Sequence, residues 1–458
     1  MTNLYKHQTE ALALCTKGNH ALFHECGTGK TLTMLEAIRA FKAQGLGPAL
    51  VVCPLSIIEP AWIADCTRFT PDLSIVSLWD SKPAERVKRL GQQSDIYVCN
   101  YETLKILYPH ICKKGFKILV VDESSKMKEP KSQITKCLLS FAGIRFRGSP
   151  FKAECVIPHR YCLSGTPAPN LEDEYWSQIK FITGPGGKVF NDNYYAFRSY
   201  YFHGIPLGMT GQRMWKFREY MRNEFMTAMR PVTHVVRKED ALDLPEQVHE
   251  VRKVYLGKEE QKAYDTMKKD LILYYKDEVI VASSALVEIM KLRQLTSGFA
   301  YYTEGEAHIG DSKLKELKQL LGEIGKEQVI IWVNFKSEIQ TLLKELPSSR
   351  ALWSGTEDRN NDIADFQSGK FQYFVIHPQS GGHGLTFAGC HYAVYYSLCY
   401  SYELLKQSQD RIHRIGQKNK CTYYYLIADK TIDEVVHKTL TSKEKLSNMV
   451  LDFLKGGE

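Results

Sequence analysis

Residues 23–31 read FHECGTGKT, and this stretch decides the fold of the chain around it. An apolar run at residues 21–23 leads into it, and an amphipathic segment follows, with Leu32, Leu35 and Ile38 at helical spacing. This order predicts a strand, a glycine-rich loop and the N-terminus of a helix. Glycines let backbone N–H groups close around phosphate oxygens, and the helix start adds partial positive charge there. The stretch therefore predicts a phosphate-binding loop.

The side chains of this loop predict a site for ATP and magnesium. Lys30 is expected to reach the β and γ phosphates, and the Thr31 hydroxyl is expected to ligate the magnesium ion. His24 stands where the usual pattern has its first glycine, so a plain glycine turn before a helix remains the alternative. The residues expected to hold the nucleotide are Gly27, Thr28, Gly29, Lys30 and Thr31.

The composition fits a globular protein of two or three domains. The chain has 458 residues, of which 44% are hydrophobic and 24% are charged. Its net charge of +8 permits a polyanionic partner, but a basic surface without such a partner fits equally well. No apolar run is long enough to cross a bilayer, and the N-terminus lacks a signal-like core. We therefore expect a cytoplasmic protein without a membrane partner.

The twelve cysteines predict buried thiols rather than zinc sites. No two of them are spaced as CxxC, and Cys53, Cys99 and Cys162 lie inside apolar runs that are typical of strands. Free buried thiols are usual in proteins of a reducing compartment. The cysteine pattern therefore agrees with the intracellular location that we expect.

Two further predicted strands end in polar residues. Residues 117–121, KILVV, predict a strand that delivers Asp122 and Glu123 at its tip. We expect Asp122 to bind magnesium and Glu123 to act as general base for the attacking water, although a solvated turn would give the same pattern. Residues 160–166, RYCLSGT, predict another strand, whose Ser-Gly-Thr tip would lie beside the carboxylates and sense the γ phosphate.

The middle of the chain predicts an insertion and a domain boundary. Residues 184–230 are rich in Tyr, Phe and Arg, and they predict a helical insertion that either faces nucleic acid or, as we favour, forms a local packing cluster. The apolar pattern breaks between Pro231 and Pro245. We place the boundary there, with an ATP-binding domain at residues 1–235 and a second domain at 236–458.

The second half of the chain predicts another α/β domain. Residues 256–296 have helical spacing of their apolar side chains, and strand-like runs then alternate with helical segments. The fold class is therefore α/β, with two tandem domains that each hold a mainly parallel sheet with flanking helices. The runs expected to form the second sheet are residues 328–333, 371–376, 391–396 and 421–427.

A paired-arginine segment lies near the end of this second domain. Residues 407–417 read QSQDRIHRIGQ, with Arg411 and Arg414 three positions apart. At a helix end, this spacing allows two guanidinium groups to point at one phosphate group. A charged helix face is the alternative, but the abrupt Ile-Gly-Gln ending of the segment favours a site loop. An arginine that reaches the γ phosphate would stabilise the charge of the transition state.

The assembled motifs resemble, in sequence and order, those of the Swi/Snf-type ATPases of helicase superfamily two. The resemblance runs from about residue 4 to residue 433 and is most specific in LSGTPAPN and DRIHRIGQ. A chain of this length is similar to the compact bacteriophage or bacterial members. The matching motifs are LYKHQ, ECGTGKT, VVCPLSIIEPAW, NYETL, VVDESSKMKEP, LSGTPAPNLEDEYW, VIIWVNF, SGGHGLTFAG and QSQDRIHRIGQ.

The resemblance implies a motor of two RecA-like domains that hydrolyses ATP and moves along duplex DNA, generally without separating the strands. It implies that Gln8 reads the adenine, and it repeats the roles of Lys30, Thr31, Asp122 and Glu123 given above. The residues that match the arginine-finger motif are Gln407, Arg411 and Arg414. The cofactors implied are ATP and Mg²⁺, and the partner implied is double-stranded DNA, bound by a monomer.

The resemblance also implies which residues link ATP to DNA. Ser164 and Thr166 match the family's coupling motif. The residues that match elements gripping the DNA backbone are Thr103, Ser380 and Gly382, the last two in the loop at 380–384.

Two positions depart from the family pattern. Ser125 stands where the family frequently has a histidine, which leaves the route of coupling between ATP and DNA open. His377 and Pro378 precede Gly381 in place of the usual Ser-Thr, which leaves the DNA grip there open. The alternatives to a duplex translocase are a strand-separating helicase on DNA or RNA and a nucleotide-switched DNA-binding module.

Overall fold

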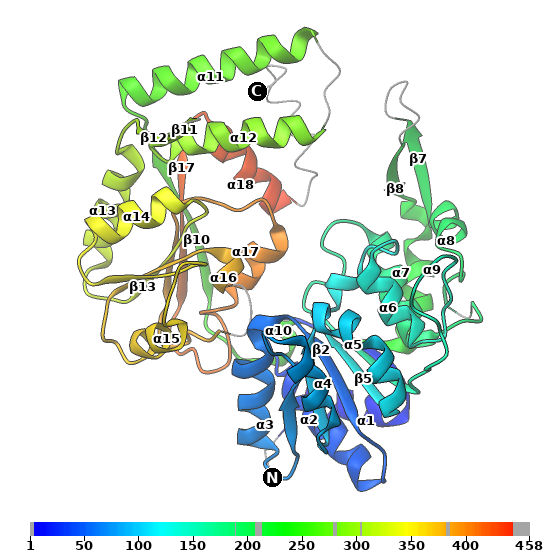
Figure 1. Cartoon of the computed structure of the whole chain (residues 1–458). Coiled ribbons are helices and arrows are strands. Elements are labelled where there is room, and N and C mark those ends of the chain that lie inside the picture. Colours follow the sequence, from blue (N-terminus) through cyan, green and yellow to red (C-terminus); the bar gives the residue numbers. More distant parts are fainter. Residues whose placement is uncertain are drawn as a thin grey trace. The chain divides into compact units, whose positions relative to one another are not determined.

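The computed structural model describes residues 4–187, 189–206, 213–277, 282–302, 305–381 and 385–442. The chain divides into two compact units, Met1–Asp243 and Leu244–Glu458, and each contains its own sheet (Figure 1). The division falls between Pro231 and Pro245, in the segment where the sequence loses its apolar pattern, and eight residues after the boundary that we placed at 235.

The sheet of unit 1 has seven parallel strands in the order β3-β4-β2-β5-β6-β1-β9. Its strands, together with the hairpin strands β7 and β8, are β1 (His20–His24), β2 (Ala49–Cys53), β3 (Ile75–Ser77), β4 (Ile96–Asn100), β5 (Ile118–Asp122), β6 (His159–Leu163), β7 (Phe202–Pro206), β8 (Arg213–Phe217) and β9 (Thr233–Val236). Its helices are α1 (Lys6–Lys17), α2 (Lys30–Ala43), α3 (Ala64–Phe69), α4 (Pro83–Gly91), α5 (Tyr101–Lys114), α6 (Gln133–Ser140), α7 (Tyr175–Thr183), α8 (Tyr194–Tyr201), α9 (Arg222–Met229) and α10 (Lys238–Ala241).

Helices cover both faces of this sheet, which is why its central strands β2 and β5 are continuous apolar runs rather than alternating ones. In β2, Leu50 and Val52 join a buried cluster with residues of α5, α6 and α7. The intervening residues, Val51 and Cys53, join a separate cluster with residues of α1, α2 and α3. Successive strand side chains point to opposite faces, so the run ALVVC serves both layers.

The aromatic residues of the predicted insertion form a packing cluster. Phe190, Phe197, Phe217 and Phe225 are buried. Their ring centroids lie 4.7 Å apart for Phe190 and Phe197, 5.1 Å for Phe190 and Phe225, and 5.3 Å for Phe217 and Phe225. The local-packing interpretation of residues 184–230 is therefore confirmed for these rings. Helices α8 and α9 and the β7–β8 hairpin are built around them.

The sheet of unit 2 has six parallel strands in the order β10-β17-β16-β13-β15-β14. The strands of the unit are β10 (Gln247–Val254), β11 (Phe299–Tyr302), β12 (Gly305–His308), β13 (Val329–Trp332), β14 (Ser349–Leu352), β15 (Tyr373–Ile376), β16 (Tyr392–Tyr395) and β17 (Cys421–Ala428). Its helices are α11 (Lys258–Asp277), α12 (Ala282–Thr296), α13 (Ser312–Ile324), α14 (Lys336–Glu345), α15 (Arg359–Gln367), α16 (Pro378–Gly381), α17 (Tyr402–Gln409) and α18 (Ile432–Ser442). The predicted pair of tandem α/β domains is confirmed.

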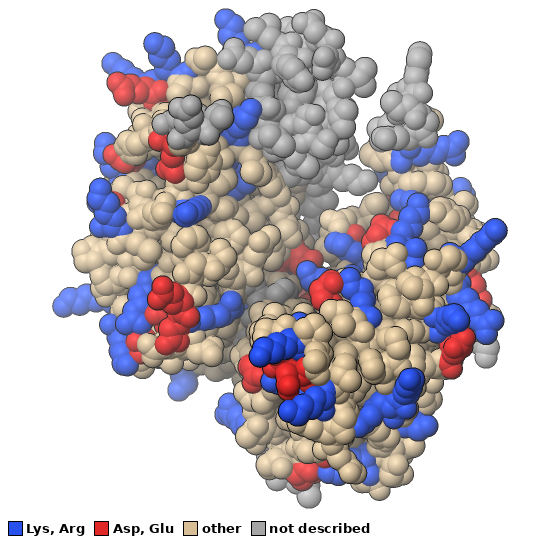
Figure 2. All heavy atoms as spheres, viewed as in Figure 1, with Lys and Arg blue, Asp and Glu red and all other residues tan. Residues whose placement is uncertain are grey.

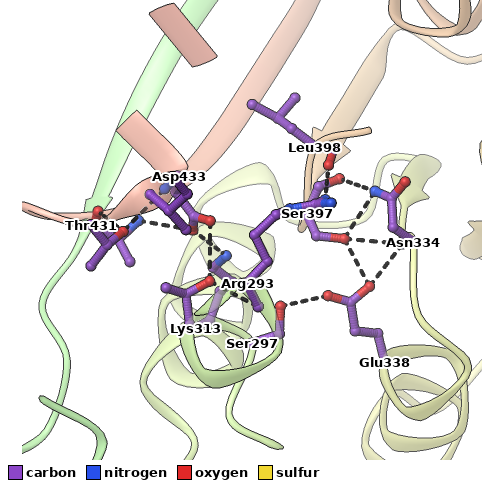
Figure 3. Close-up of polar contacts among 12 residues, drawn as sticks. Arg293, Ser297, Lys313, Asn334, Glu338, Ser397, Leu398, Thr431 and Asp433 are labelled. Atoms are coloured by element: carbon purple, nitrogen blue, oxygen red, sulfur yellow. Dashed lines mark hydrogen bonds and ion pairs between the residues drawn. The ribbon is translucent and has the colours of Figure 1, made fainter. Parts of the chain in front are cut away.

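A buried ion pair fastens α13 to α18 in unit 2 (Figure 3). The Lys313 Nζ atom lies 2.7 Å from an Asp433 carboxylate oxygen, and the Lys313 side chain is 1% exposed. The other Asp433 oxygen accepts a hydrogen bond of 3.1 Å from the Thr296 hydroxyl, at the end of α12. One carboxylate therefore ties together three helices of the unit.

We expect Asp433→Ala to lower the free energy of unfolding by about 3–5 kcal/mol, because it leaves the buried Lys313 ammonium without its carboxylate. Urea unfolding followed by circular dichroism measures this loss. Glu246→Ala is the matched control, since it removes an exposed carboxylate 3.1 Å from Lys420, and it should cost about 1 kcal/mol or less. Equal losses in the two variants would contradict the assigned role of Asp433.

Charge is dispersed over the visible surface. On the face shown in Figure 2, Lys and Arg side chains are spread over both units, with Asp and Glu side chains among them. The net charge of +8 is therefore not gathered into one patch on this face. Among the described residues, no helix combines the length and apolar character that crossing a bilayer requires.

Candidate active site

The phosphate-loop stretch has the predicted strand–loop–helix order. Strand β1 ends at His24, and α2 begins at Lys30. Gly27 and Gly29 have φ angles of 86° and 83°, in the left-handed region that favours glycine. A Cβ atom on Gly29 would also lie 2.2 Å from the Gln8 amide nitrogen. The left-handed backbone therefore requires glycine at this position, and a Cβ atom there would also displace the Gln8 side chain.

Two of the predicted nucleotide ligands donate hydrogen bonds to the loop itself. The Gln8 amide donates to the carbonyls of Thr28 and Gly29, at 3.4 Å and 3.3 Å. The Lys30 ammonium donates to the carbonyls of His24, at 2.8 Å, and Glu25, at 3.3 Å. These contacts place both side chains on the phosphate loop. The adenine role of Gln8 and the phosphate role of Lys30 stay predictions.

His24, the departure from the usual loop pattern, is buried at the end of β1. Its Nε2 atom lies 2.8 Å from Nδ1 of His234, on β9. Burial, together with the charges of Lys30, His234 and His7, lowers the pKa of His24 to about 2. The folded protein therefore keeps this imidazole neutral, whereas an unfolded chain charges it below about pH 6.5.

The low pKa of His24 predicts that the free energy of unfolding falls in acid, and that His24→Gln removes this part of the loss. Stability from the neutral imidazole is full above pH 6.5 and is lost as the pH falls toward the folded-state pKa of about 2. Between pH 7.5 and 5.5, wild type should lose about 1.4 kcal/mol more than His24→Gln, measured by urea unfolding at both values. His110→Gln, at an exposed histidine, is the control. Parallel losses in wild type and His24→Gln would contradict the prediction.

The acidic pair lies at the tip of β5, as predicted. Asp122 is the last residue of the strand and is buried. Its Oδ2 accepts a hydrogen bond of 3.0 Å from Trp62 Nε1, and its Oδ1 accepts one of 2.9 Å from the Glu123 backbone. Burial raises the pKa of Asp122, while the nearby Lys30 ammonium lowers it. The acidic tip and the phosphate loop therefore share one electrostatic environment.

Glu123 has an unusual backbone conformation. Its φ of 54° lies in the left-handed region, which a residue with a Cβ adopts at a cost of about 1–3 kcal/mol. The Tyr101 hydroxyl holds this turn by donating to the carbonyls of Asp122, at 2.6 Å, and Glu123, at 3.1 Å. The role of Glu123 as general base stays a prediction.

The side-chain oxygens of Thr31 and Asp122 fit a magnesium ion. A threonine hydroxyl and a carboxylate are hard ligands of the kind that Mg²⁺ prefers. The hydrogen bonds from Trp62 and the Glu123 backbone orient the Asp122 carboxylate, and a carboxylate keeps free lone pairs when it accepts two such bonds. Thr31 and Asp122 are thus the candidate metal ligands.

The Ser-Gly-Thr tip lies beside both motifs. Strand β6 pairs with β5 so that Leu163 is opposite Asp122, and the Ser164 backbone donates to the Leu22 carbonyl of β1 at 3.2 Å. A Cβ atom on Gly165 would lie 3.0 Å from the Cys26 backbone nitrogen. The Thr166 backbone donates to the Ser164 hydroxyl at 3.2 Å. The structure therefore brings the three motifs of unit 1 together at the carboxyl ends of the neighbouring strands β5, β6 and β1, as the strand pattern predicts.

Thr103, predicted to contact DNA, is fully buried. Its hydroxyl accepts a hydrogen bond of 3.2 Å from Arg86, on α4, and its backbone donates to the Asn100 side chain at 3.1 Å. A phosphate approaching this position would meet the partly exposed Arg86 before the Thr103 hydroxyl. The sequence pattern did not indicate Arg86, because nothing in the spacing connects α4 to the start of α5.

In unit 2 the two arginines of the predicted finger motif converge on one acceptor. Both Arg411 and Arg414 donate to the Leu385 carbonyl, at 3.0 Å and 2.9 Å. They lie in the turn after α17, which ends at Gln409. Arg411 is 2% exposed and also donates to the Gln407 carbonyl, so it holds the turn together. Arg414 is partly exposed and is the better candidate for a ligand.

Gln407 and Ser380 are positioned within unit 2, and Gly382 lies outside the described residues. The buried Gln407 donates to the Glu403 carboxylate at 3.3 Å, and its amide oxygen has no hydrogen-bond partner among the described residues. The Ser380 carbonyl, in α16, accepts a hydrogen bond from Arg359. Their roles toward nucleotide and DNA stay predictions.

His413, between the two arginines, was not predicted to have a role. Its Nε2 atom lies 2.8 Å from the Pro245 carbonyl, and its Nδ1 atom lies 2.8 Å from the Gln247 amide nitrogen. With the proton on Nε2, the ring donates to Pro245 and accepts from Gln247. The arginine turn is therefore fastened to the segment that begins unit 2.

A second polar cluster, also not predicted, lies at the carboxyl ends of β13 and β16 (Figure 3). The Asn334 amide donates to the Ser397 carbonyl at 2.8 Å. The buried Glu338 carboxylate accepts from the Ser397 hydroxyl, at 2.8 Å, and from the Ser297 hydroxyl, at 2.6 Å. The polar Asn334 directly after the apolar run VIIWV was the available signal. Ligand loops of open α/β sheets gather at such strand ends.

The chain matches two family models that together span most of its length. Residues 7–298 match the SNF2-related domain, and residues 312–416 match the helicase conserved C-terminal domain. A solved structure of the Sulfolobus solfataricus SWI2/SNF2 ATPase core in complex with dsDNA is 21% identical, covers 99% of this chain and 94% of that chain, and has a TM-score of 0.45.

The similar curated proteins include phage, bacterial and eukaryotic chains. "Putative protein p41" of Acyrthosiphon pisum secondary endosymbiont phage 1 is 26% identical, over 94% of this chain and 93% of the phage protein. The Bacillus subtilis "Putative ATP-dependent helicase/translocase YwqA" is 21% identical, over 94% of this chain and 46% of that protein. A Caenorhabditis elegans SWI/SNF-related protein is 25% identical, over 96% of this chain and 61% of that protein. The chain therefore belongs to the SNF2-related family, with the SNF2-related and helicase C-terminal ATPase domains of that family.

Proposed function

We propose that the protein is a DNA-stimulated ATPase that translocates on double-stranded DNA. The observation that supports this most is the meeting of three motifs in unit 1. Lys30 is close enough to Asp122 to lower its pKa, and Gly165 approaches the phosphate loop at Cys26. The printed name of the Bacillus subtilis relative, a putative ATP-dependent helicase/translocase, agrees with this activity.

The side chains at the phosphate loop and the acidic tip of unit 1 each have a proposed role in ATP hydrolysis. Lys30 leaves the carbonyls of His24 and Glu25 to bind the β and γ phosphates, whose oxygens are stronger acceptors. Glu123 takes the proton of the attacking water. Thr31 and Asp122 would hold Mg²⁺, which supplies positive charge to the phosphate oxygens.

Arg414 is the proposed arginine finger. A guanidinium group near the γ phosphate stabilises the negative charge that develops during phosphoryl transfer. Arg414 donates a hydrogen bond of 2.9 Å to the neutral Leu385 carbonyl, and a phosphate oxygen is a stronger, charged acceptor for the same guanidinium. Arg411, with contacts to the carbonyls of Gln407 and Leu385, is proposed to position the turn.

Triplex displacement tests translocation on duplex DNA. A third strand bound in the major groove should be released with ATP and wild-type protein, and it should stay bound with Lys30→Ala. A forked duplex in parallel tests strand separation. Release of the triplex strand without separation of the fork supports the proposal. Separation of the fork would favour the helicase alternative, and no release from either substrate would favour the nucleotide-switched binding module.

A further inference from the structure

The acidic turn and the Ser-Gly-Thr loop share a hydrogen-bond bridge whose two side chains are buried. The Ser124 hydroxyl donates to the Gln178 amide oxygen at 2.6 Å. The Gln178 amide nitrogen donates to the Pro167 carbonyl at 2.7 Å and to the Glu174 carbonyl, within the same helical region, at 3.2 Å. Ser124 and Gln178 are both 0% exposed. One amide on α7 therefore joins the residue after Glu123 to the residue after Thr166.

We propose that Gln178 is a positioning residue that transmits the state of the acidic turn to the loop at residues 164–167. The proposal deepens the proposed function and rests on it for the direction of coupling. The loop is held at two ends, by the close approach of Gly165 to the phosphate loop and by the bond from Gln178 to Pro167. A shift of the acidic turn moves Ser124, and the bridge carries this shift to Pro167.

The chemistry of an amide suits this task. Gln178 accepts with its oxygen and donates with its nitrogen, so it bridges a hydroxyl on one side and a carbonyl on the other. Because the Ser124 hydroxyl and the Gln178 amide are buried, a broken bond between them leaves a buried polar group unpaired. The acidic turn and the loop at residues 164–167 are therefore held in a fixed relative position.

The first test is hydrogen exchange with a non-hydrolysable ATP analogue and Mg²⁺. In wild type, the analogue should protect the phosphate loop and change exchange at residues 164–170. In Gln178→Met, which keeps the side-chain length but neither hydrogen bond, the phosphate loop should still be protected and the change at 164–170 should be lost. The same response at 164–170 in both proteins would overturn the proposal.

The second test separates this role from a general loss of stability. Gln178→Met should lower the stimulation of ATP turnover by duplex DNA about tenfold, with basal turnover and KM for ATP unchanged at a temperature where the variant is folded. Its Tm should fall, because the buried Ser124 hydroxyl loses its acceptor. Ser124→Ala, which removes only a hydroxyl, should lower the stimulation in the same direction, and the double variant should be no worse than the stronger single variant. Additive losses, or an equal fall of basal and stimulated turnover, would overturn the proposal.

Ser177→Ala is the matched control, one residue away on α7. The Ser177 hydroxyl is buried and has no hydrogen-bond partner among the described residues. Its removal should leave hydrogen exchange at residues 164–170 and the stimulation of ATP turnover by duplex DNA as in wild type. A loss of stimulation equal to that of Gln178→Met would overturn the proposal. Transmission to residues 164–170 without any stimulation by duplex DNA would support the bridge and contradict the proposed function. Failure of the bridge proposal and failure of the proposed function therefore give different results.

Discussion

Lys30→Ala is expected to abolish ATP hydrolysis, with a fall in kcat of about a thousandfold. The variant removes the one ammonium group of the phosphate loop, which now donates to the carbonyls of His24 and Glu25. It also removes the positive charge that lowers the pKa of Asp122 against the effect of burial. Both losses weaken the site for the phosphates and the metal ion.

Steady-state phosphate release measures this effect, and Lys42→Ala is the control. Lys42 lies on the same helix α2, but its ammonium pairs with Asp95 at 2.8 Å and is 45% exposed. Its loss should leave turnover near wild type. Glu123→Gln, which keeps the size of the side chain but not the base, should also lose turnover. Lys30→Ala with wild-type turnover would remove the phosphate loop from the proposed mechanism.

Arg414→Ala is expected to lower kcat by about 10³ while leaving the affinity for ATP largely intact, because the guanidinium acts on charge that develops in the transition state. Arg411 stays in place in this variant, with its contacts to Gln407 and Leu385. The turn should therefore keep its shape. Turnover and equilibrium binding of a fluorescent ATP analogue, measured side by side, separate the two effects.

The control for Arg414→Ala is Lys420→Ala, which removes an exposed cation near the same turn, paired with Glu246 at 3.1 Å. This variant should hydrolyse ATP as wild type does. Arg414→Ala with normal turnover would refute the finger assignment. Loss of ATP binding in parallel with turnover would show instead that Arg414 acts on the ground state.

The fold was largely predictable because its strands are continuous apolar runs. Residues 49–53, ALVVC, were expected to form a strand and do so as β2. Strand β10 was not predicted, since QVHEVRKV carries charged residues and lies at the edge of its sheet, where most of its side chains are not buried. Edge strands are not required to be apolar, so the sequence pattern does not reveal them.

The candidate site was predictable where a motif lies at a strand end and not where a contact joins distant residues. The tip of β5 with Asp122 and Glu123 is of the first kind. The bond between Ser124 and Gln178 is of the second kind, since it joins positions 54 residues apart and Gln178 lies in an otherwise ordinary helix. The burial of Arg411 also needed the structure, because its spacing from Arg414 is the same for a ligand and for an anchor.

The measurement that tests the central claim most directly is ATP hydrolysis by the purified protein with no nucleic acid, single-stranded DNA, double-stranded DNA and RNA in parallel. The proposed translocase requires that duplex DNA stimulates turnover more than the other three conditions. Stronger stimulation by single-stranded DNA or RNA, or no stimulation by any nucleic acid, would contradict it.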